Sequence, residues 1–239
     1  MPMLLFMAAH LAVSRRLLPL LAYPSNEWRP LNRNAEMKIL LKSLLLFSLC
    51  CVSASAVEKV DLFEAGKDGY ALYRIPGIVV TTQGTVLAYC VGRKSPGDWA
   101  DIDIFLRRNT DGGKTWQPPR KLGDVGASTV DNPTAIVDRN TGAVHMLYQV
   151  DYARAFYMRS DDVGRTISEP AEITCVFEEF REEYDWNVIS PGTVHGIQLA
   201  GGRVIVPVWL STGGRRHRPS IVSVIYSDDH GRTWRRGDV

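Results

Sequence analysis

Short runs of apolar residues, mostly Val, Ile, Leu and Tyr, recur between residues 70 and 227 and are separated by Gly, Pro, Asn and Asp. Runs of this length and composition, bounded by turn-forming residues, are typical of half-buried β-strands. The pattern predicts strands over 78–81, 85–91, 102–108, 134–137, 144–150, 155–160, 196–199, 203–209 and 220–227. The acidic and aromatic segment 172–186 is interpreted as an irregular loop, and no amphipathic helix of convincing length is found in 57–239. The pattern therefore predicts an all-β fold.

A turn motif of the form S-x-D-x-G-x-T-W recurs among these strands. It is complete at 227–234 (SDDHGRTW) and modified at 109–116 (NTDGGKTW) and 160–167 (SDDVGRTI). Its Asp can accept backbone N–H bonds, its Gly permits positive φ, and its Trp can pack back onto the sheet. Small antiparallel sheets repeated about every 50 residues indicate propeller blades, of which this chain would form three to four. We expect the turn motifs on the face opposite the ligand site.

The N-terminal region has a different pattern. Basic residues from Lys38 to Lys42 precede an apolar run at 44–52 and the small residues 54–56, which is the layout of a secretory signal peptide. The sequence predicts a non-native upstream extension at 1–36, a signal peptide at 37–56 and a propeller segment at 57–239. It therefore predicts a protein that is secreted, periplasmic or held at the cell surface. A membrane anchor over 39–57 is the alternative, and Lys42 weakens it.

Composition excludes several classes of protein. With 45% hydrophobic residues, 23% charged residues and a net charge of +2, the chain is neither disordered nor a basic nucleic-acid binder. It has no CxxC pair, P-loop or HExxH motif, so the sequence predicts no metal or nucleotide cofactor. In 57–239, Cys90 and Cys175 are flanked by apolar residues, which favours buried thiols over a disulfide.

Candidate chemistry is concentrated between residues 73 and 108. Arg74 lies just ahead of Pro76, and Arg93 and Asp98 lie in the Gly- and Pro-flanked segment 92–100. A guanidinium that can bind a carboxylate through two hydrogen bonds, near a carboxyl group beside a Trp, indicates a site for an acidic ligand with a proton donor alongside. Two further carboxyl groups compete for the acid role but run into the next strand: Asp101 and Asp103.

This combination resembles the opening of the exo-α-sialidases (neuraminidases), of the bacterial type with Asp-box (BNR) repeats. The resemblance is carried by Arg74-Ile75-Pro76, Gly92-Arg93, Gly97-Asp98-Trp99 and the three turn motifs, and it covers roughly residues 70–239. It implies a six-bladed β-propeller, of which this chain would be the N-terminal half. It also implies retaining hydrolysis of terminal sialic acid from glycoproteins, gangliosides and oligosaccharides, without a metal or other cofactor and without a membrane span.

The resemblance also implies roles for the arginines. Arg74, followed by Ile75, would be the first of three arginines that grip the sialic-acid carboxylate, since a guanidinium stays charged at any working pH. Arg93 would lie near the 4-hydroxyl of the sugar, although a structural salt bridge to a nearby Asp explains it as well.

The carboxyl groups have implied roles as well. Asp98 would be the general acid/base, its pKa raised by desolvation beside Trp99 and by the charge of the bound substrate. Asp131 would face the 4-hydroxyl or N-acetyl side of the sugar, and an Asx turn before Pro133 is an equally good interpretation.

Other residues remain ambiguous. His195 and Trp209 could line the pocket, but packing roles are favoured, and the basic cluster 215–218 is interpreted as a solvated loop that could steer anionic glycans. The tyrosine nucleophile of the family, its glutamate and the other two arginines have no match in this sequence, and no Tyr is assigned to that role. The alternative function is therefore a catalytically incomplete propeller that at most binds sialylated glycans.

Overall fold

The computed structural model describes residues 58–192, 195–213 and 216–239. Residues 59–239 form one compact unit. The predicted extension at 1–36 and signal peptide at 37–56 lie outside the described residues. Within the part of the chain that the structure describes, no helix is both long and apolar enough to cross a membrane.

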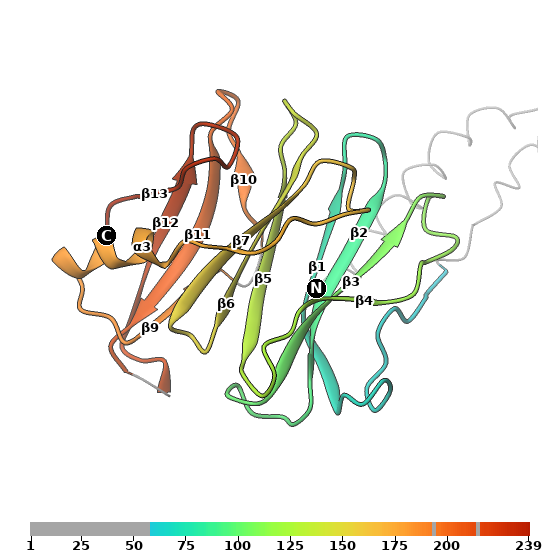
Figure 1. Cartoon of the computed structure of the whole chain (residues 1–239), viewed down its shortest axis with the longest axis horizontal. Helices are drawn as coiled ribbons and strands as arrows, with labels where there is room; N and C mark the ends of the chain where they lie inside the picture. The colour runs from blue at the N-terminus through green and yellow to red at the C-terminus, as the bar shows by residue number, and fades with distance from the viewer. Residues whose placement is uncertain (1–57, 193–194, 214–215) are drawn as a thin grey trace, which may run out of the picture. The chain divides into compact units, whose positions relative to one another are not determined.

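Three antiparallel sheets follow one another along the chain (Figure 1). Blade 1 has the order β1 (Leu72–Val80), β2 (Val86–Arg93), β3 (Ile102–Asn109) and β4 (Arg120–Gly123). Blade 2 has the order β5 (Val130–Val137), β6 (Val144–Val150), β7 (Arg154–Ser160) and β8 (Ala171–Glu172). In blade 3, β9 (Val188–Pro191) and β10 (Ile197–Gln198) both pair with β11 (Val204–Ser211), which is followed by β12 (Ser220–Ser227) and β13 (Arg235–Arg236). The all-β prediction and the partial propeller are confirmed.

Two apolar layers hold the blades together. The first lies between blades 1 and 2 and includes Leu87, Ile104 and Met146, and the second lies between blades 2 and 3 and includes Leu147 and Leu210. The strands bury alternate side chains in these layers because successive side chains of a strand point to opposite faces. Each fully buried Leu or Ile contributes roughly 1.5–3 kcal/mol to stability.

Blade 1 also reaches into blade 2 through a tyrosine. Tyr89 is buried, and its hydroxyl oxygen accepts a hydrogen bond from the backbone N–H of Ala135 at 3.2 Å. Its ring passes over Gly77, where an added Cβ would lie 2.1 Å from the ring carbon Cζ. Glycine is therefore required at position 77 so that β1 can lie against this ring.

All three turn motifs adopt the same hydrogen-bonded turn. The Ser160 hydroxyl accepts a bond from the backbone of Gly164 at 2.8 Å, and the Asp162 carboxylate accepts one from the Thr166 hydroxyl at 2.7 Å. In the modified motif at 109–116, the side-chain oxygen of Asn109 replaces the Ser hydroxyl and accepts from Gly113 at 2.8 Å. The motifs follow the ends of β3, β7 and β12, whereas the loop that carries the candidate acid precedes β3. Their predicted position at the opposite end from the site is confirmed.

Two predictions for the segment around residue 175 are wrong. The predicted loop 172–186 contains the short helix α3 (Thr174–Glu178) and the 3₁₀ turn η2 (Glu179–Glu182). They form because Phe177 and Phe180, three residues apart, are both fully buried against blade 3. Cys175 is exposed on this helix, because the buried face belongs to its neighbours, whereas Cys90 is buried as predicted.

Candidate active site

Two strand irregularities aim the candidate site residues. The register of β1 against β2 shifts directly after Arg74, and that of β5 against β6 shifts directly after Asp131. At each shift the residue before a proline has a positive φ, 51° at Ile75 and 56° at Asn132. Such a bulge turns a side chain out of the regular alternation, and positive φ is unusual for a β-branched residue. β1 therefore starts earlier than the predicted strand at 78, and it includes the Arg-Ile-Pro motif.

The four charged residues singled out in the sequence form one continuous network. Arg93 is only 2% exposed; its Nη1 donates to Asp98 Oδ1 at 2.6 Å and its Nη2 donates to Asp131 Oδ2 at 2.8 Å. Arg74 Nη1 donates to the same Asp98 oxygen at 3.3 Å. Sequence reasoning therefore selected residues that the fold brings together, although Arg74 and Asp131 come from different blades.

Asp98 is accessible, and the protein's own groups shift its pKa in the direction opposite to the one expected with substrate bound. Its side chain is 49% exposed. The hydrogen bond from Arg93, together with the charges of Arg93 and Arg74, holds the pKa of Asp98 below its ordinary value despite partial desolvation. The sequence could not reveal this shift, because it depends on the contact between two arginines and one carboxylate.

Asp131 is buried behind Arg93 and does not line the pocket. Its side chain is 0% exposed, and burial raises the pKa of Asp131 against the opposing charge of Arg93. Its Oδ1 accepts the backbone N–H of Asn132 at 2.6 Å. This bond is not the predicted Asx turn, because that turn needs the N–H of residue 133 and Pro133 has none. Tyr152 donates a longer bond, at 3.4 Å, to its other oxygen. This geometry makes Asp131 a partner of Arg93, and not a direct ligand-binding group.

A pocket of about 270 Å³ opens over this network. It is lined by Arg74, Ile75, Arg93, Asp98, Asn132, Tyr152, Trp209, His217 and Ser220, which come from all three blades. Three of the lining residues are aromatic: Tyr152, Trp209 and His217. Trp99 supports two of them, since its ring centroid is 4.8 Å from that of Tyr152 and the His217 ring stacks on it with an interplanar angle of 3°. Charged groups on one side and aromatic faces on the other suit a ligand with an acidic group on a sugar ring.

The structure resolves several alternatives from the sequence. Trp209 lines the pocket, whereas a packing role was favoured for it. His217 belongs to the cluster 215–218 that was interpreted as a solvated loop, and this is wrong for its imidazole, because the rings of Trp99 and Tyr152 cover it. No local signal in the sequence indicates that position 217 returns to a loop of blade 1.

The two carboxyl groups that compete for the acid role, Asp101 and Asp103, bind other residues. The Asp101 carboxylate forms an ion pair with Lys94 at 2.7 Å. Asp103 is buried, where it accepts hydrogen bonds from the Tyr70 hydroxyl and from Lys121. Asp98 is therefore the carboxylate of this loop that faces the pocket.

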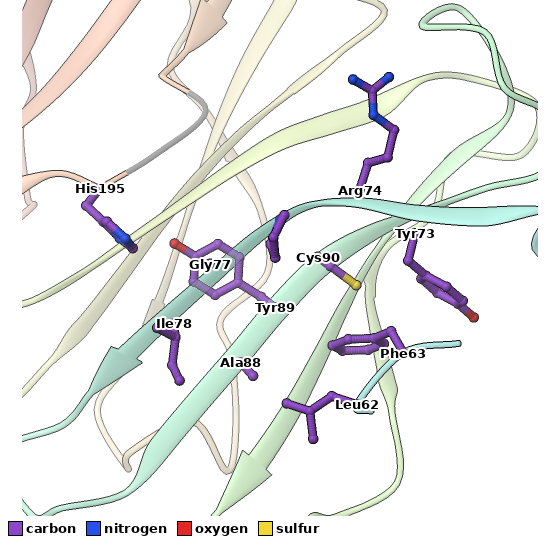
Figure 2. Close-up of a pocket in the computed structure, with 11 residues that line it drawn as sticks. Leu62, Phe63, Tyr73, Arg74, Gly77, Ile78, Ala88, Tyr89, Cys90 and His195 are labelled. Atoms are coloured by element: carbon purple, nitrogen blue, oxygen red, sulfur yellow. The ribbon is translucent and has the colours of Figure 1, made fainter. Parts of the chain in front are cut away.

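His195 lies in a different pocket, which is lined mainly by residues of β1 and β2. This pocket has a volume of about 500 Å³ and is mainly apolar (Figure 2). Figure 2 shows His195 near the Tyr89 ring, and the Arg74 guanidinium pointing away from Leu62 and Phe63. Among the described residues, no carboxylate lines this larger pocket, so the smaller one is the candidate for acid/base chemistry.

Comparisons with known proteins point to one family. Residues 84–239 match the family model of the BNR repeat-like domain. A sialidase of Bacteroides fragilis is 30% identical over 217 residues, which cover 77% of this chain and 39% of the relative. Sialidase-4 of Homo sapiens is 32% identical over 209 residues, which cover 75% of this chain and 42% of the relative.

A solved structure, the Hadza microbial sialidase Hz136, superposes with a TM-score of 0.63 at 27% identity, over 73% of this chain and 39% of that one. The chain thus spans well under half the length of these three proteins. From the family match and the shared fold, we conclude that the chain belongs to the sialidase family with a BNR repeat-like domain.

Proposed function

We propose that this chain supplies the carboxylate clamp and the general acid/base of an exo-α-sialidase. Such an enzyme hydrolyses terminal sialic acid from glycoproteins, gangliosides and oligosaccharides with retention of configuration. The observation that carries the proposal is the convergence of Arg74 and Asp98, 3.3 Å apart, on one pocket. The relatives named sialidase support the choice of substrate class.

Arg74 is suited to hold the carboxylate of the sugar. Its side chain is half-exposed at the pocket, and among the described residues it forms an ion pair only with Asp98, through a long bond. Most of its N–H donors are therefore free for a ligand, and a guanidinium can bind a carboxylate through two parallel hydrogen bonds. The apolar side chain of Ile75 borders the same pocket.

Asp98 is suited to protonate the glycosidic oxygen and then to accept a proton from water. A substrate carboxylate bound to Arg74 would compete with Asp98 for that cation and add a negative charge beside it. Both effects raise the pKa of Asp98 from its lowered value towards the range that a general acid needs. Arg93, fixed by Asp131, would orient the Asp98 carboxylate throughout.

Activity can be tested with a fluorogenic aryl sialoside. Asp98→Asn should reduce turnover at least ~100-fold, the usual contribution of general-acid help. The matched control is Asp185→Asn, which changes a highly exposed carboxylate on a loop outside the pocket and should leave turnover unchanged. Unchanged turnover by Asp98→Asn would refute the acid/base role. Binding of free sialic acid without any release of product, even by the unmodified chain, would favour the alternative of a glycan-binding module.

Export through the segment 37–56 is part of the same proposal. It rests on the sequence pattern alone. N-terminal sequencing of the secreted protein should find a mature end at Val57, and a cell-associated product that keeps the segment would contradict it.

A further inference from the structure

We propose a second anion site at the junction of blades 1 and 2, which takes a sulfate or phosphate group. A pocket of about 220 Å³ lies there, lined by Arg108, Arg120 and Arg165 together with Gln117 and Gly164. Arg108 is near the end of β3, whereas the loop that carries the proposed acid precedes β3, so the two sites lie at opposite ends of the blade.

Backbone carbonyl groups of the second turn motif fix two of these arginines. Arg108 is 7% exposed, and its Nε donates to the carbonyl of Val163 at 2.8 Å. Arg120 donates from Nη1 to the carbonyl of Arg165 at 2.5 Å and from Nη2 to the carbonyl of Gly164 at 3.1 Å. A guanidinium carries five N–H donors, so most of the donors of Arg108 and Arg120 remain for a ligand. No nitrogen of Arg108 is buried without a partner, and Arg120 is exposed, so the remaining donors of both face accessible space.

The charge of this cluster is not balanced within the protein. Among the described residues, no carboxylate forms a salt bridge with Arg108, Arg120 or Arg165. Asp162 is the carboxylate whose charge acts on Arg108, and its oxygens accept bonds from Thr166 and from other groups of its own turn. Burial and the charges of Arg165 and Arg120 lower the pKa of Arg108, as expected where like charges crowd together.

The junction of blades 2 and 3 has the same construction with the charge neutralised. There Arg159 takes the place of Arg108 and donates to the carbonyl of His230 at 2.7 Å. Unlike Arg108, Arg159 is paired with a carboxylate, Asp161, at 2.7 Å. The residue in the corresponding position of the first turn motif is Thr110. The two junctions thus differ at one position: the junction of blades 2 and 3 has the carboxylate of Asp161, and the junction of blades 1 and 2 has the neutral side chain of Thr110.

The first junction also has one more cation than the second. In blade 1, Arg120 of β4 lies opposite Leu106 of β3. The matching position in blade 2 is on β8, opposite Tyr157 of β7, and it holds Ala171. Arginine is the side chain that binds tetrahedral oxyanions best, because its planar fork matches two oxygens at once. Three guanidinium groups around a small pocket therefore favour a doubly charged oxyanion. Free sulfate and hydrogen phosphate are such ions, and the sulfate ester of a sugar presents the same kind of terminal oxygens with a single negative charge.

Binding can be measured by isothermal titration calorimetry of the full chain with sodium sulfate, sodium phosphate and N-acetylglucosamine 6-sulfate. Sodium chloride at matched ionic strength is the reference. We expect Arg120→Gln and Arg165→Gln, which change exposed residues, to weaken sulfate binding about tenfold or more, as the loss of one charge-assisted hydrogen bond predicts. Thr110→Asp should weaken it similarly, because it supplies the carboxylate present at the other junction.

Arg232→Gln is the matched control, because Arg232 occupies in the third motif the position of Arg165 in the second. It should leave sulfate binding unchanged. Sulfate also stabilises folded proteins in general, because it is excluded from their surface. Any rise in melting temperature that sulfate causes is therefore compared between the unmodified chain and Arg165→Gln. Tighter binding of the sugar sulfate than of free sulfate identifies an ester as the ligand, and the reverse order identifies the free ion. The proposal would be overturned if titration with sulfate released no more heat than titration with chloride. It would also be overturned if Arg232→Gln and Arg165→Gln weakened sulfate binding equally.

Discussion

Arg93 holds the site together, and replacing it with Met tests that role most sharply. The change removes the guanidinium and keeps most of the apolar stem of this nearly buried side chain. Asp131 would then remain fully buried with one strong neutral donor, the backbone N–H of Asn132, and a long bond from Tyr152. Asp98 would lose its 2.6 Å partner but would stay half-exposed to water.

The expected loss of stability follows from the burial of Asp131. Breaking a buried ion pair by removing one partner typically costs about 3–5 kcal/mol, because the other charge is left uncompensated. Asp98 adds little to this figure, because solvent screens exposed pairs to roughly 0–1 kcal/mol. We therefore expect Arg93→Met to lower the free energy of unfolding by about 3–5 kcal/mol at pH 7.

The loss should depend on pH with a definite sign. Without Arg93, burial would raise the pKa of Asp131 further, so the folded state would hold a proton that the unfolded state releases above about 3.8. The cost of Arg93→Met should therefore be small near pH 4 and grow as the pH rises to 7.

Urea unfolding of four proteins gives the required cycle: the unmodified chain, Arg93→Met, Asp131→Asn and the double variant. The double variant should be considerably more stable than Arg93→Met, because it no longer buries the charge of Asp131. A loss of unfolding free energy below about 1 kcal/mol in Arg93→Met, or a loss that does not depend on pH, would refute the argument that the loss comes from a buried unpaired charge.

Two further predictions concern packing and titration. Burial lowers the pKa of His145 to about 4, so stability should be constant above about pH 6.5 and fall by roughly 3 kcal/mol as the pH drops to 4, because the unfolded chain takes up the proton first. Urea unfolding between pH 4.5 and 7 checks this, and the same slope in His145→Gln would contradict it. Gly77→Ala should lower stability by about 1–3 kcal/mol, because the new Cβ collides with Tyr89. Gly201→Ala, in open space, should change it by less than about 0.5 kcal/mol, and equal melting temperatures of the two variants would show that position 77 is not crowded.

The parts of the fold that local rules control could be predicted from the sequence. Alternating apolar residues and the turn motifs identified the blades, because strand period and turn chemistry act over a few residues. The nearness of Arg74 and Asp98 was also predictable, since their two motifs lie on neighbouring strands and loops of blade 1. The helix at Thr174–Glu178 was not, because a single helical turn carries too little periodicity to be distinguished from a loop.

The parts that depend on contacts between blades could not be predicted. His217 enters the pocket because aromatic rings from blades 1 and 2 converge there, and no spacing in the sequence encodes that convergence. The burial of Asp131 behind Arg93 likewise arises from packing of blade 1 against blade 2. Tertiary contacts of this kind set the electrostatics of the site.

The most direct test of the account is binding of sialic acid compared with its methyl ester, followed by calorimetry or ligand-observed NMR. The ester keeps the sugar and removes the charge that Arg74 is proposed to hold. The account predicts that the unmodified chain prefers the acid by at least about tenfold, the worth of one charge-assisted hydrogen bond, and that Arg74→Met removes this preference. Arg203→Met, which changes an arginine of similar exposure paired with Asp228 on blade 3, should retain it. Equal affinity for acid and ester, or an undiminished preference in Arg74→Met, would contradict the claim that this guanidinium recognises an acidic sugar.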